Sequence, residues 1–585
     1  MNKEQVVITG MARTPMGSFQ GSLSSEKAPD LGSIAIKGAI KRANIKPEDI
    51  DDVVMGCVLP AGMGQAPARQ AAIGAGIPNT SGATTINKMC GSGMRAAMIA
   101  TDQLLAGSSL ISLAGGIESM SNAPYILPKV RDGLRMGHGK VQDHMFIDGL
   151  EDAYEPGRLM GSYAEATAEA YQFTREEQDN FAIRSLKRAK KANEDGSFDE
   201  EMVPVTIKTR KGSIEVTKDE QPFNADINKI PNLKPAFSKD GTVTAANSSS
   251  ISDGAAALVM MTMQEAEKKN SKPLAKIVAH ATNSHDPAWF TTAPIGAIQK
   301  VLDKAAWDIK DVGLFEINEA FAVVPMAAMK DLSISPDIVN VHGGACALGH
   351  PVGTSGARIM ATLISAMHKY KVDKGIASLC IGGGEATAWA IDWEPNGMGY
   401  TIGWNRPSEG VVTHFRHNDG IIDWYSPIPQ DVSALEWSPI GDVLVVGLHD
   451  PGRMMIIDQI GTILNDLGWH STVSAGTGVP ADVLDVSVSL GGMMASAGRD
   501  GSIEIWNGPA SMPELVAVLG NHLTREVSMH PRFNLLAMAD SSGTMSVRNL
   551  TTGGIERQCF HPDHGMPLDD IPYAKSVDWG DDESV

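Results

Sequence analysis

The chain has 585 residues, which is more than one hydrophobic core holds, so we expect several domains. A formal net charge of −20 argues against nucleic-acid partners, and five cysteines without metal-ligand spacing predict neither a disulfide framework nor a metal site. Because the start of the chain lacks the features of a secretion signal and no apolar run is long enough to span a membrane, the sequence predicts a cytoplasmic protein without a membrane partner.

The first third of the chain alternates strand and helix signals. Val6 to Thr9 predicts a short buried strand, and the stretch from Leu31 to about Arg42 predicts a helix. After Cys90, apolar residues recur at helical spacing as far as Leu105, and Gly107 is well placed to end that helix. These signals indicate an α/β domain.

Two segments far apart in the chain repeat one pattern. Asn87–Arg95 and Gly349–Arg358 each end in Ser-Gly-x-Arg and open a predicted helix. Each helix is followed by a small, apolar, strand-like run that ends in glycines and a glutamate, Ser112–Glu118 in the first copy and Ser378–Glu385 in the second. The chain therefore contains a duplication.

The two copies differ in the residues that could do chemistry. Cys90 precedes the first helix, His350 precedes the second, and Cys380 lies just before the glycines of the second copy. A helix N-terminus favours a thiolate, and an imidazole nearby could take the thiol proton. Because a lone free cysteine is most often a small buried apolar residue, the surrounding sequence has to decide between the two interpretations.

Four segments in this order and spacing resemble the signature segments of the thiolase family: Cys90, Asn318–Phe321, Gly343–Pro351 and Cys380–Gly384. The resemblance covers Met1 to about Trp393. It implies an α/β fold of the duplicated, layered αβαβα type. The N-terminal half would comprise residues 1–271, with an inserted loop domain at about 121–249, and the C-terminal half residues 272–393.

The loop domain would cover the acyl-CoA. Within it, Thr174 and Glu177 form a plausible capping box ahead of an amphipathic helix through Phe181 and Ala189. The basic run Lys208 to Lys211, with Lys218, is either a solvated turn or a contact for the phosphates of coenzyme A.

The resemblance assigns roles to five catalytic residues. Cys90 would carry the acyl group, His350 would take its proton, and Cys380 would deprotonate the second thioester. The backbone N–H groups of Cys90 and Gly382 would form one oxyanion hole, and His350 with a water held by Asn318 the other. Gly382 suits this task because a side chain there would block close approach.

Further residues would bind the substrate, and coenzyme A thioesters would be substrates, with no tightly bound cofactor and no metal. The family segment that lies along the pantetheine arm resembles Gly241–Ser249 here. The substrate-binding residues implied by the resemblance are Met160, Ser249, Ala320 and Phe321.

The sequence departs from the family pattern at several positions. Cys346 stands where an aliphatic residue is expected, and we interpret it as a packing substitution. Glu385 and Ala386 replace the more common apolar residue and glycine, and Arg158–Met160 lacks a His-Met pair, which leaves the preferred acyl length open.

From about residue 400 to 585 the chain is predicted to be all-β. Its strand-like segments resemble WD repeats, best at Asp500–Trp506, and the glycines Gly452, Gly501 and Gly543 recur every 40–50 residues. Asp419–Trp424 matches only a closing strand and Ser576–Gly580 only a blade start, so the sequence predicts an incomplete propeller-like segment whose open edges need a protein partner.

The resemblance implies an acetyl-CoA C-acetyltransferase that forms or cleaves acetoacetyl-CoA through an acyl-cysteine, as a homodimer or homotetramer. Two alternatives stay within the same family: a degradative 3-ketoacyl-CoA thiolase of broader chain length, and a protein that keeps the fold without turnover. A third makes the WD-repeat-like segment the functional part, as a scaffold for partners. An assay of thiolysis separates these alternatives.

Overall fold

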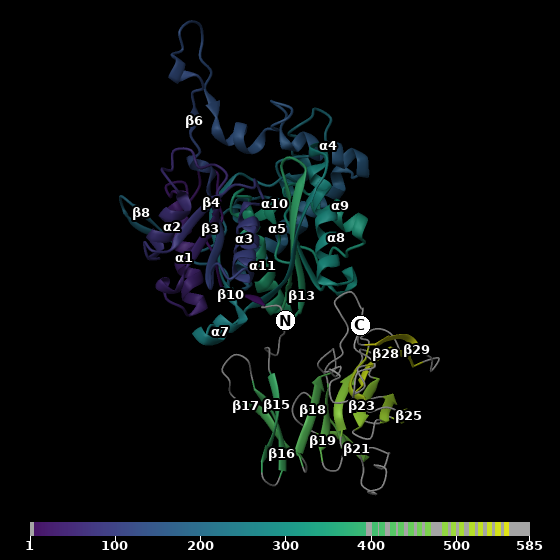
Figure 1. Cartoon of the computed structure of the whole chain (residues 1–585). Coiled ribbons are helices and arrows are strands. Elements are labelled where there is room, and N and C mark those ends of the chain that lie inside the picture. The colour runs from purple at the N-terminus through teal and green to yellow at the C-terminus, as the bar shows by residue number, and fades with distance from the viewer. Residues whose placement is uncertain are drawn as a thin grey trace. The chain divides into compact units, whose positions relative to one another are not determined.

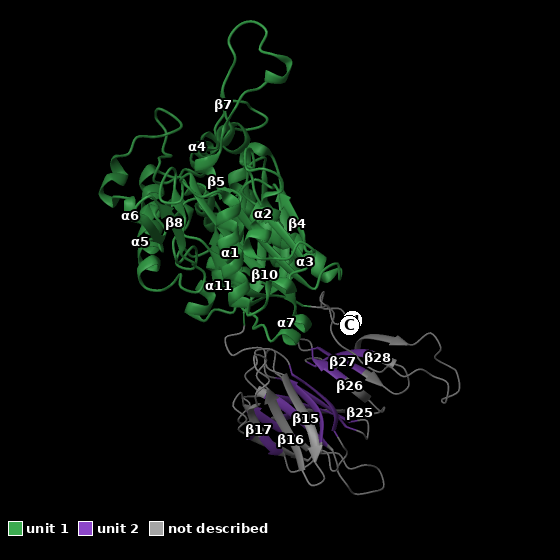
Figure 2. Cartoon of the chain, turned by 90° about the vertical axis from the view of Figure 1, so that its left-hand side faces the viewer, with its two compact units in different colours: residues 1–395 green, residues 396–585 purple. Residues whose placement is uncertain are grey.

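The structure is a computed structural model, and the chain in it divides into two compact units, Met1–Pro395 and Asn396–Val585 (Figure 2). It describes residues 5–393 without a break and then a series of shorter segments. These segments are 400–406, 409–415, 422–428, 431–437, 443–449, 453–458, 463–469, 483–488, 493–498, 502–507, 514–520, 524–529, 535–540, 544–550 and 555–560.

Unit 1 is built around a ten-stranded sheet. Its strands are β1 (Val6–Arg13), β2 (Gly17–Ser18), β3 (Asp52–Gly56), β4 (Gly82–Ile86), β5 (Ile111–Ser119), β10 (Ser252–Thr262), β11 (Ala275–Ser284), β12 (Leu314–Ile317), β13 (Lys374–Ile381) and β14 (Glu385–Asp392). In the first half, β3 and β5 are parallel, and β10 and β1 follow antiparallel. In the second half, β12 and β13 are parallel, and β14 and β11 follow antiparallel. The repeated strand order is the structural form of the duplication seen in the sequence.

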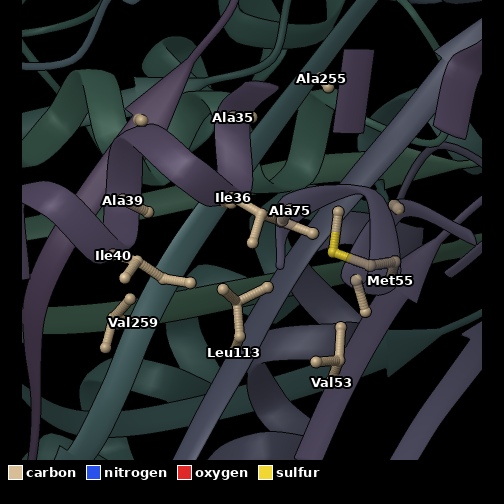
Figure 3. Close-up of a cluster of buried hydrophobic side chains, with 14 of the residues drawn as sticks. Ala35, Ile36, Ala39, Ile40, Val53, Met55, Ala75, Leu113, Ala255 and Val259 are labelled. Carbon is tan, nitrogen blue, oxygen red and sulfur yellow. The ribbon is translucent and has the colours of Figure 1, made fainter. Parts of the chain in front are cut away.

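Helices lie on both outer faces of the sheet and between its halves. They are α1 (Ala28–Ala43), α2 (Pro67–Ala75), α3 (Ser92–Leu105), α7 (Met263–Lys269), α8 (Ala293–Ala305), α9 (Val323–Leu332), α10 (Ala345–Leu348) and α11 (Ser355–Tyr370). One apolar cluster joins α1 and α2 to the first half, and Figure 3 shows Ile36 and Ile40 of α1 over Leu113 and Val259 of the sheet. A second places α3 and α11 between the halves, and a third joins α8 and α9 to the second half. Unit 1 therefore has the expected αβαβα layers (Figure 1).

The glycines of the two Ser-Gly-x-Arg segments let the central helices approach closely. A Cβ atom on Gly93 would lie 2.7 Å from the backbone nitrogen of Ala357, and one on Gly356 would lie 2.4 Å from that of Met94. A side chain at either glycine would push α3 and α11 apart. The repeated glycine thus brings the starts of both helices, and the residues just before them, together.

The elements predicted in the first third of the chain are confirmed, and the first strand and the first helix are longer than predicted. The strand at Val6 continues to Arg13, and the helix predicted from Leu31 begins at Ala28, with a proline in its first turn. The helix after Cys90 ends at Leu105, and Gly107 adopts a φ of 70° just beyond it. Among the residues that the structure describes, no helix has the length and apolar character that a membrane crossing requires.

The segment between the duplicated parts carries its own small elements. These are β6 (Tyr125–Ile126), β7 (Gln142–Asp143), α4 (Met160–Tyr171), α5 (Arg175–Glu194), β8 (Val205–Thr209), β9 (Gly212–Val216) and α6 (Gln221–Asn224). The capping box is confirmed: the Glu177 backbone N–H donates to Thr174 Oγ1 at 3.2 Å, and Thr174 N–H donates to the Glu177 carboxylate at 2.7 Å. The predicted apolar face of α5, including Phe181 and Ala189, is buried.

The described part of unit 2 consists of four antiparallel sheets, each made of consecutive strands. They are β15 (Tyr400–Arg406), β16 (Glu409–Phe415) and β17 (Ile422–Ile428); β18 (Asp431–Trp437), β19 (Val443–His449), β20 (Arg453–Asp458) and β21 (Ile463–Trp469); β22 (Val483–Val488), β23 (Met494–Gly498), β24 (Ser502–Asn507) and β25 (Glu514–Gly520); and β26 (Thr524–Met529), β27 (Leu535–Asp540), β28 (Thr544–Asn549) and β29 (Ile555–Phe560).

The sheets of unit 2 follow one another through their first strands. Strand β15 contacts β18, β18 contacts β22, and β22 contacts β26. Ser487 on β22 accepts a hydrogen bond from the backbone of Met529 at 3.0 Å and donates to Glu436 at 3.4 Å, which links three sheets. The β-rich character predicted after residue 400 is therefore present. The glycine markers Gly452, Gly501 and Gly543, with Asp419, Gly420 and Ser576–Gly580, lie outside the described residues.

Candidate active site

Cys90 lies in a tight turn between β4 and α3. Met89, immediately before it, has a φ of 47°, in the left-handed region that residues other than glycine seldom adopt. The turn is closed by backbone hydrogen bonds from Gly91 to Lys88 and from Ser92 to Met89, both 3.0 Å. A strained turn that its neighbours hold in place is a frequent feature of reactive sites, and here it presents the thiol at the start of a helix.

The surroundings of Cys90 favour its thiol over the thiolate. Burial raises its pKa to about 11, against the hydrogen bonds from the backbone N–H groups of Gly382 and of Cys90 itself, which lower it. The expectation that the helix end alone yields a thiolate near neutral pH is therefore wrong, because loss of hydration outweighs the two donors. Cys90 consequently needs a base.

His350 has the orientation of a base. The imidazole is buried, and its Nδ1 lies 2.5 Å from Ser355 Oγ. Because the Ser355 hydroxyl donates to the carbonyl of Pro351 at 3.0 Å, it accepts from Nδ1–H, which leaves the lone pair on Nε2. Nε2 has no hydrogen-bond partner among the described residues. Burial, reinforced by Arg358, lowers the pKa of His350 to about 3, so the resting ring is neutral and its Nε2 carries no proton.

The buried carboxylate of Glu118 ties the His350 turn to the first half of the fold. It accepts backbone hydrogen bonds from Val58 at 2.9 Å, from Leu59 at 3.2 Å and from Gly353 at 3.0 Å. Burial raises its pKa to about 7, against these three donors, which lower it. Val352 of the same turn packs in one apolar cluster with Cys90, so the two turns are neighbours.

Cys380 is a fully buried residue at the end of β13, next to the glycine turn Gly382–Gly384. Burial, and then the proximity of Cys90, raise the pKa of its thiol well above the usual range. The charge of Cys90 therefore acts on the Cys380 thiol. A Cβ atom on Gly382 would lie at an ordinary contact distance, 3.7 Å, from the sulfur of Met160. A Cβ atom at position 382 would therefore not clash with the described residues, and their packing does not require glycine there.

Asn318 follows β12, and its backbone N–H donates a hydrogen bond to the carbonyl of Ser378 at 3.0 Å. Its side-chain amide is buried, and neither polar atom has a hydrogen-bond partner among the described residues. Burying such an amide is costly, so an unpaired one is suited to hold a substrate atom or a water. The adjacent Glu319 is buried and accepts from the backbone of Cys346 at 3.1 Å, which fixes the segment that leads to His350.

The residues expected to bind substrate surround one apolar region. Ser249 donates its backbone N–H to the carbonyl of Ala320 at 2.9 Å, and Phe321 meets Phe237 edge to face with ring centroids 6.0 Å apart. Met160, at the start of α4, packs in the same cluster as Phe237 and Phe321. The basic residues of the candidate coenzyme A contact are exposed on, or just after, the β8–β9 hairpin: Lys208, Arg210, Lys211 and Lys218.

Comparison with known proteins identifies the family in which this arrangement occurs. The family model described as the thiolase N-terminal domain matches residues 6–264, and the one described as the thiolase C-terminal domain matches residues 271–393. The chain belongs to the thiolase family. This part of the chain is therefore an acyltransferase of the thiolase type.

Relatives named acetyl-CoA acetyltransferase are similar over nearly their whole length. The protein of that name from Rhizobium meliloti (strain 1021) is 47% identical over 393 residues, which are 67% of this chain and 100% of the relative. Acetyl-CoA acetyltransferase 2 of Arabidopsis thaliana is 49% identical over 395 residues, 67% of this chain and 98% of the relative. The crystal structure of the Bacillus anthracis acetyl-CoA acetyltransferase aligns with a TM-score of 0.65 at 42% identity, over 67% of this chain and 99% of that chain.

Three residues of this thiolase site had no role in the sequence analysis. Ser355 opens the second Ser-Gly-x-Arg segment, and Glu118 ends the first strand-like run, so both lay within recognised motifs. Phe237 had no signal beyond being aromatic. Their partners are distant in the chain, and only the folded structure identifies them.

Proposed function

We propose that the thiolase unit is an acetyl-CoA C-acetyltransferase, which condenses two acetyl-CoA molecules to acetoacetyl-CoA or cleaves acetoacetyl-CoA with coenzyme A. The observation that carries the proposal is the convergence of the two catalytic turns. The Gly382 N–H donates to the sulfur of Cys90, and His350, whose turn packs beside Cys90, has an Nε2 with no hydrogen-bond partner among the described residues. This arrangement supplies a nucleophile, a base and an oxyanion donor for acyl transfer.

In the first half-reaction, His350 Nε2 takes the Cys90 thiol proton while the sulfur attacks the thioester carbonyl. The backbone N–H groups of Cys90 and Gly382, which both point to the sulfur, are placed to stabilise the developing oxyanion. The carbon–sulfur bond to coenzyme A then breaks, and the departing thiolate receives the proton from His350. The products are acetyl-Cys90 and free coenzyme A.

In the second half-reaction, His350 Nε2 takes the Cys380 thiol proton, and the Cys380 thiolate removes a proton from the methyl group of a second acetyl-CoA. The resulting carbanion attacks acetyl-Cys90, and the Cys90 sulfur leaves and regains a proton from His350, while Cys380 is left as the thiol. Asn318, whose side-chain amide has no partner in the part of the chain that the structure describes, would hold a water that stabilises the enolate oxygen together with His350. The raised pKa of Cys380 makes it a strong base once its thiol proton has been removed.

Thiolysis tests the proposed function directly. The purified full-length protein is given acetoacetyl-CoA and coenzyme A, and the loss of the 3-ketoacyl absorbance is followed, with longer 3-ketoacyl-CoA substrates measured in parallel. The proposal expects turnover that is fastest with acetoacetyl-CoA. Faster turnover of the longer substrates would favour the degradative thiolase, and no turnover with any of them would contradict the enzymatic function.

The remaining expectations are part of the same proposal. The enzyme would act in the cytoplasm as a homodimer or homotetramer, without a tightly bound cofactor. Unit 2 would be an incomplete WD-repeat propeller that binds a protein partner. The support is its series of consecutive antiparallel sheets, with first strands in contact, which is the arrangement of propeller blades. Size-exclusion chromatography of the full chain tests the oligomer, and a pull-down with the full chain tests the partner.

A further inference from the structure

The nucleophile turn and the glycine turn are joined by an ion pair that the catalytic roles above do not use. Lys88 Nζ lies 2.5 Å from Glu385 Oε2, although the two residues are 297 positions apart. Lys88 is two residues before Cys90, and Glu385 directly follows Gly382–Gly384. Glu385 is also one of the residues at which the chain departs from the pattern of its family. Among the described residues, this ion pair is the one that links the two turns.

Both partners are built into the turns that they connect. The Lys88 backbone N–H donates to Ser92 Oγ at 2.8 Å, and its carbonyl accepts from Gly91, so the Lys88 backbone is part of the Cys90 turn. Glu385 begins β14, pairs with Ile381 across the glycine turn, and accepts from Ser284 Oγ at 3.2 Å through its second carboxylate oxygen. A change in the position of either side chain should therefore shift the backbone of the turn to which it belongs.

The ion pair reinforces a direct contact between the turns. A Cβ atom on Gly91 would lie 2.4 Å from Cδ1 of Ile381, so the Cys90 turn rests on the end of β13. Gly382, whose N–H donates to the Cys90 sulfur, directly follows Ile381, so this contact lies beside the oxyanion donor. Two turns joined by one apolar contact can shift relative to each other, because such a contact has no preferred direction. A charged hydrogen bond fixes both the direction and the distance between them.

The duplication gives this ion pair a counterpart. Glu118 and Glu385 end the equivalent runs of the two copies, and each carboxylate reaches the catalytic turn of the other copy. Glu118, in the first copy, accepts from Gly353 of the His350 turn, and Glu385, in the second, binds Lys88 of the Cys90 turn. The Glu118 contact is fully buried, whereas the side chains of Lys88 and Glu385 are 27% and 30% exposed, so the second pair tolerates substitution without an unpaired buried charge.

We propose that Lys88 and Glu385 are positioning residues, which hold the Cys90 turn against the Gly382 oxyanion donor through their ion pair. The inference rests on the proposed thiolase function. Among the described residues, no hydrogen bond or ion pair joins the Lys88 or Glu385 side chain to Cys90, His350, Asn318 or Cys380, so the pair should act on the rate of acyl transfer and not on substrate binding.

The test uses the full-length protein with Glu385→Gln, Lys88→Met and the charge-swapped double variant Lys88→Glu/Glu385→Lys. Each single variant should lower kcat for thiolysis about tenfold with KM nearly unchanged, because small misplacements at a reacting centre are costly. The swapped variant should recover most of that loss. Lys269→Met is the matched control, since it breaks a similar surface pair, with Asp49 at 2.8 Å, away from the site.

A second readout does not require turnover. Alkylation of Cys90 by iodoacetamide, followed by mass spectrometry, should slow about threefold in the single variants at pH 8 and recover in the swapped variant, because a displaced Gly382 N–H stabilises the thiolate less. Unchanged kcat and alkylation in both single variants would overturn the inference. So would a swapped variant no more active than the single variants, or an equal loss in Lys269→Met. An inactive wild-type protein with the predicted alkylation pattern would count against the proposed function alone.

Discussion

Replacing Ser355 with alanine tests how His350 becomes a base. The substitution removes the oxygen that accepts from His350 Nδ1–H at 2.5 Å, within a site where His350 is 6% exposed. A buried N–H without a partner costs roughly 1–3 kcal/mol. Only the tautomer with its lone pair on Nε2 carries this cost, because it is the one with a proton on Nδ1. A cost of about 1.4 kcal/mol would lower the population of this reactive tautomer about tenfold.

The assay for Ser355→Ala is the single-turnover rate of acetyl-Cys90 formation, followed by quenching and mass spectrometry. We expect a rate about tenfold below that of the wild type, in line with the tautomer cost. Ser365→Ala is the matched control: Ser365 lies on the same helix α11, is also buried, and has no hydrogen-bond partner for its hydroxyl among the described residues. An unchanged rate in Ser355→Ala, or an equal loss in Ser365→Ala, would refute the reasoning.

Four further outcomes are expected. Cys90→Ser should give no acetyl-enzyme, because a serine hydroxyl is far less readily ionised than a thiol, and a label that persists after acetyl-CoA treatment would contradict this role. Cys380→Ser should still accept the acetyl group yet fail to condense it, as separate half-reaction assays would reveal; equal loss of both would mean that the roles are wrong. A chain ending at Trp393 should keep full specific activity, because every catalytic segment precedes that residue, and an inactive product would misplace the boundary. Burial of His342 lowers its pKa to about 4, so the unfolded chain binds a proton between pH 6.5 and 4 that the folded chain does not, and stability falls as the pH drops through this range. The urea midpoint should therefore fall less between pH 7 and 5 in His342→Phe than in the wild type.

The sequence contained the signals that depend on neighbouring residues. Helical spacing after Cys90, the glycine at position 107 and the Thr174–Glu177 capping box each involve residues within a few turns of one another, and the structure has all three. The Ser-Gly-x-Arg repeat likewise indicated the duplication, because the same close helix packing requires glycine at Gly93 and Gly356.

The sequence could not predict properties that depend on burial and on distant partners. The helix-end effect on Cys90 was visible, but the larger loss of hydration depends on the folded surroundings of the thiol, and it reversed the direction of the pKa shift. The Glu118–Gly353 hydrogen bond joins residues 235 positions apart. Ser355 is only five residues from His350, yet its part in setting the tautomer depends on its own donation to Pro351, which sequence spacing does not reveal.

The duplicated frame produces one reactive site because the two helix starts use equivalent backbone donors differently. Gly353 stands two residues before Ser355, as Cys90 stands two residues before Ser92. The N–H of Gly353 is bound by the buried carboxylate of Glu118, whereas that of Cys90 points to the Cys90 sulfur. A helix N-terminus attracts negative charge, and in the second copy the carboxyl group of Glu118 already occupies the donor. In the first copy the same donor is left for charge that develops only during the reaction.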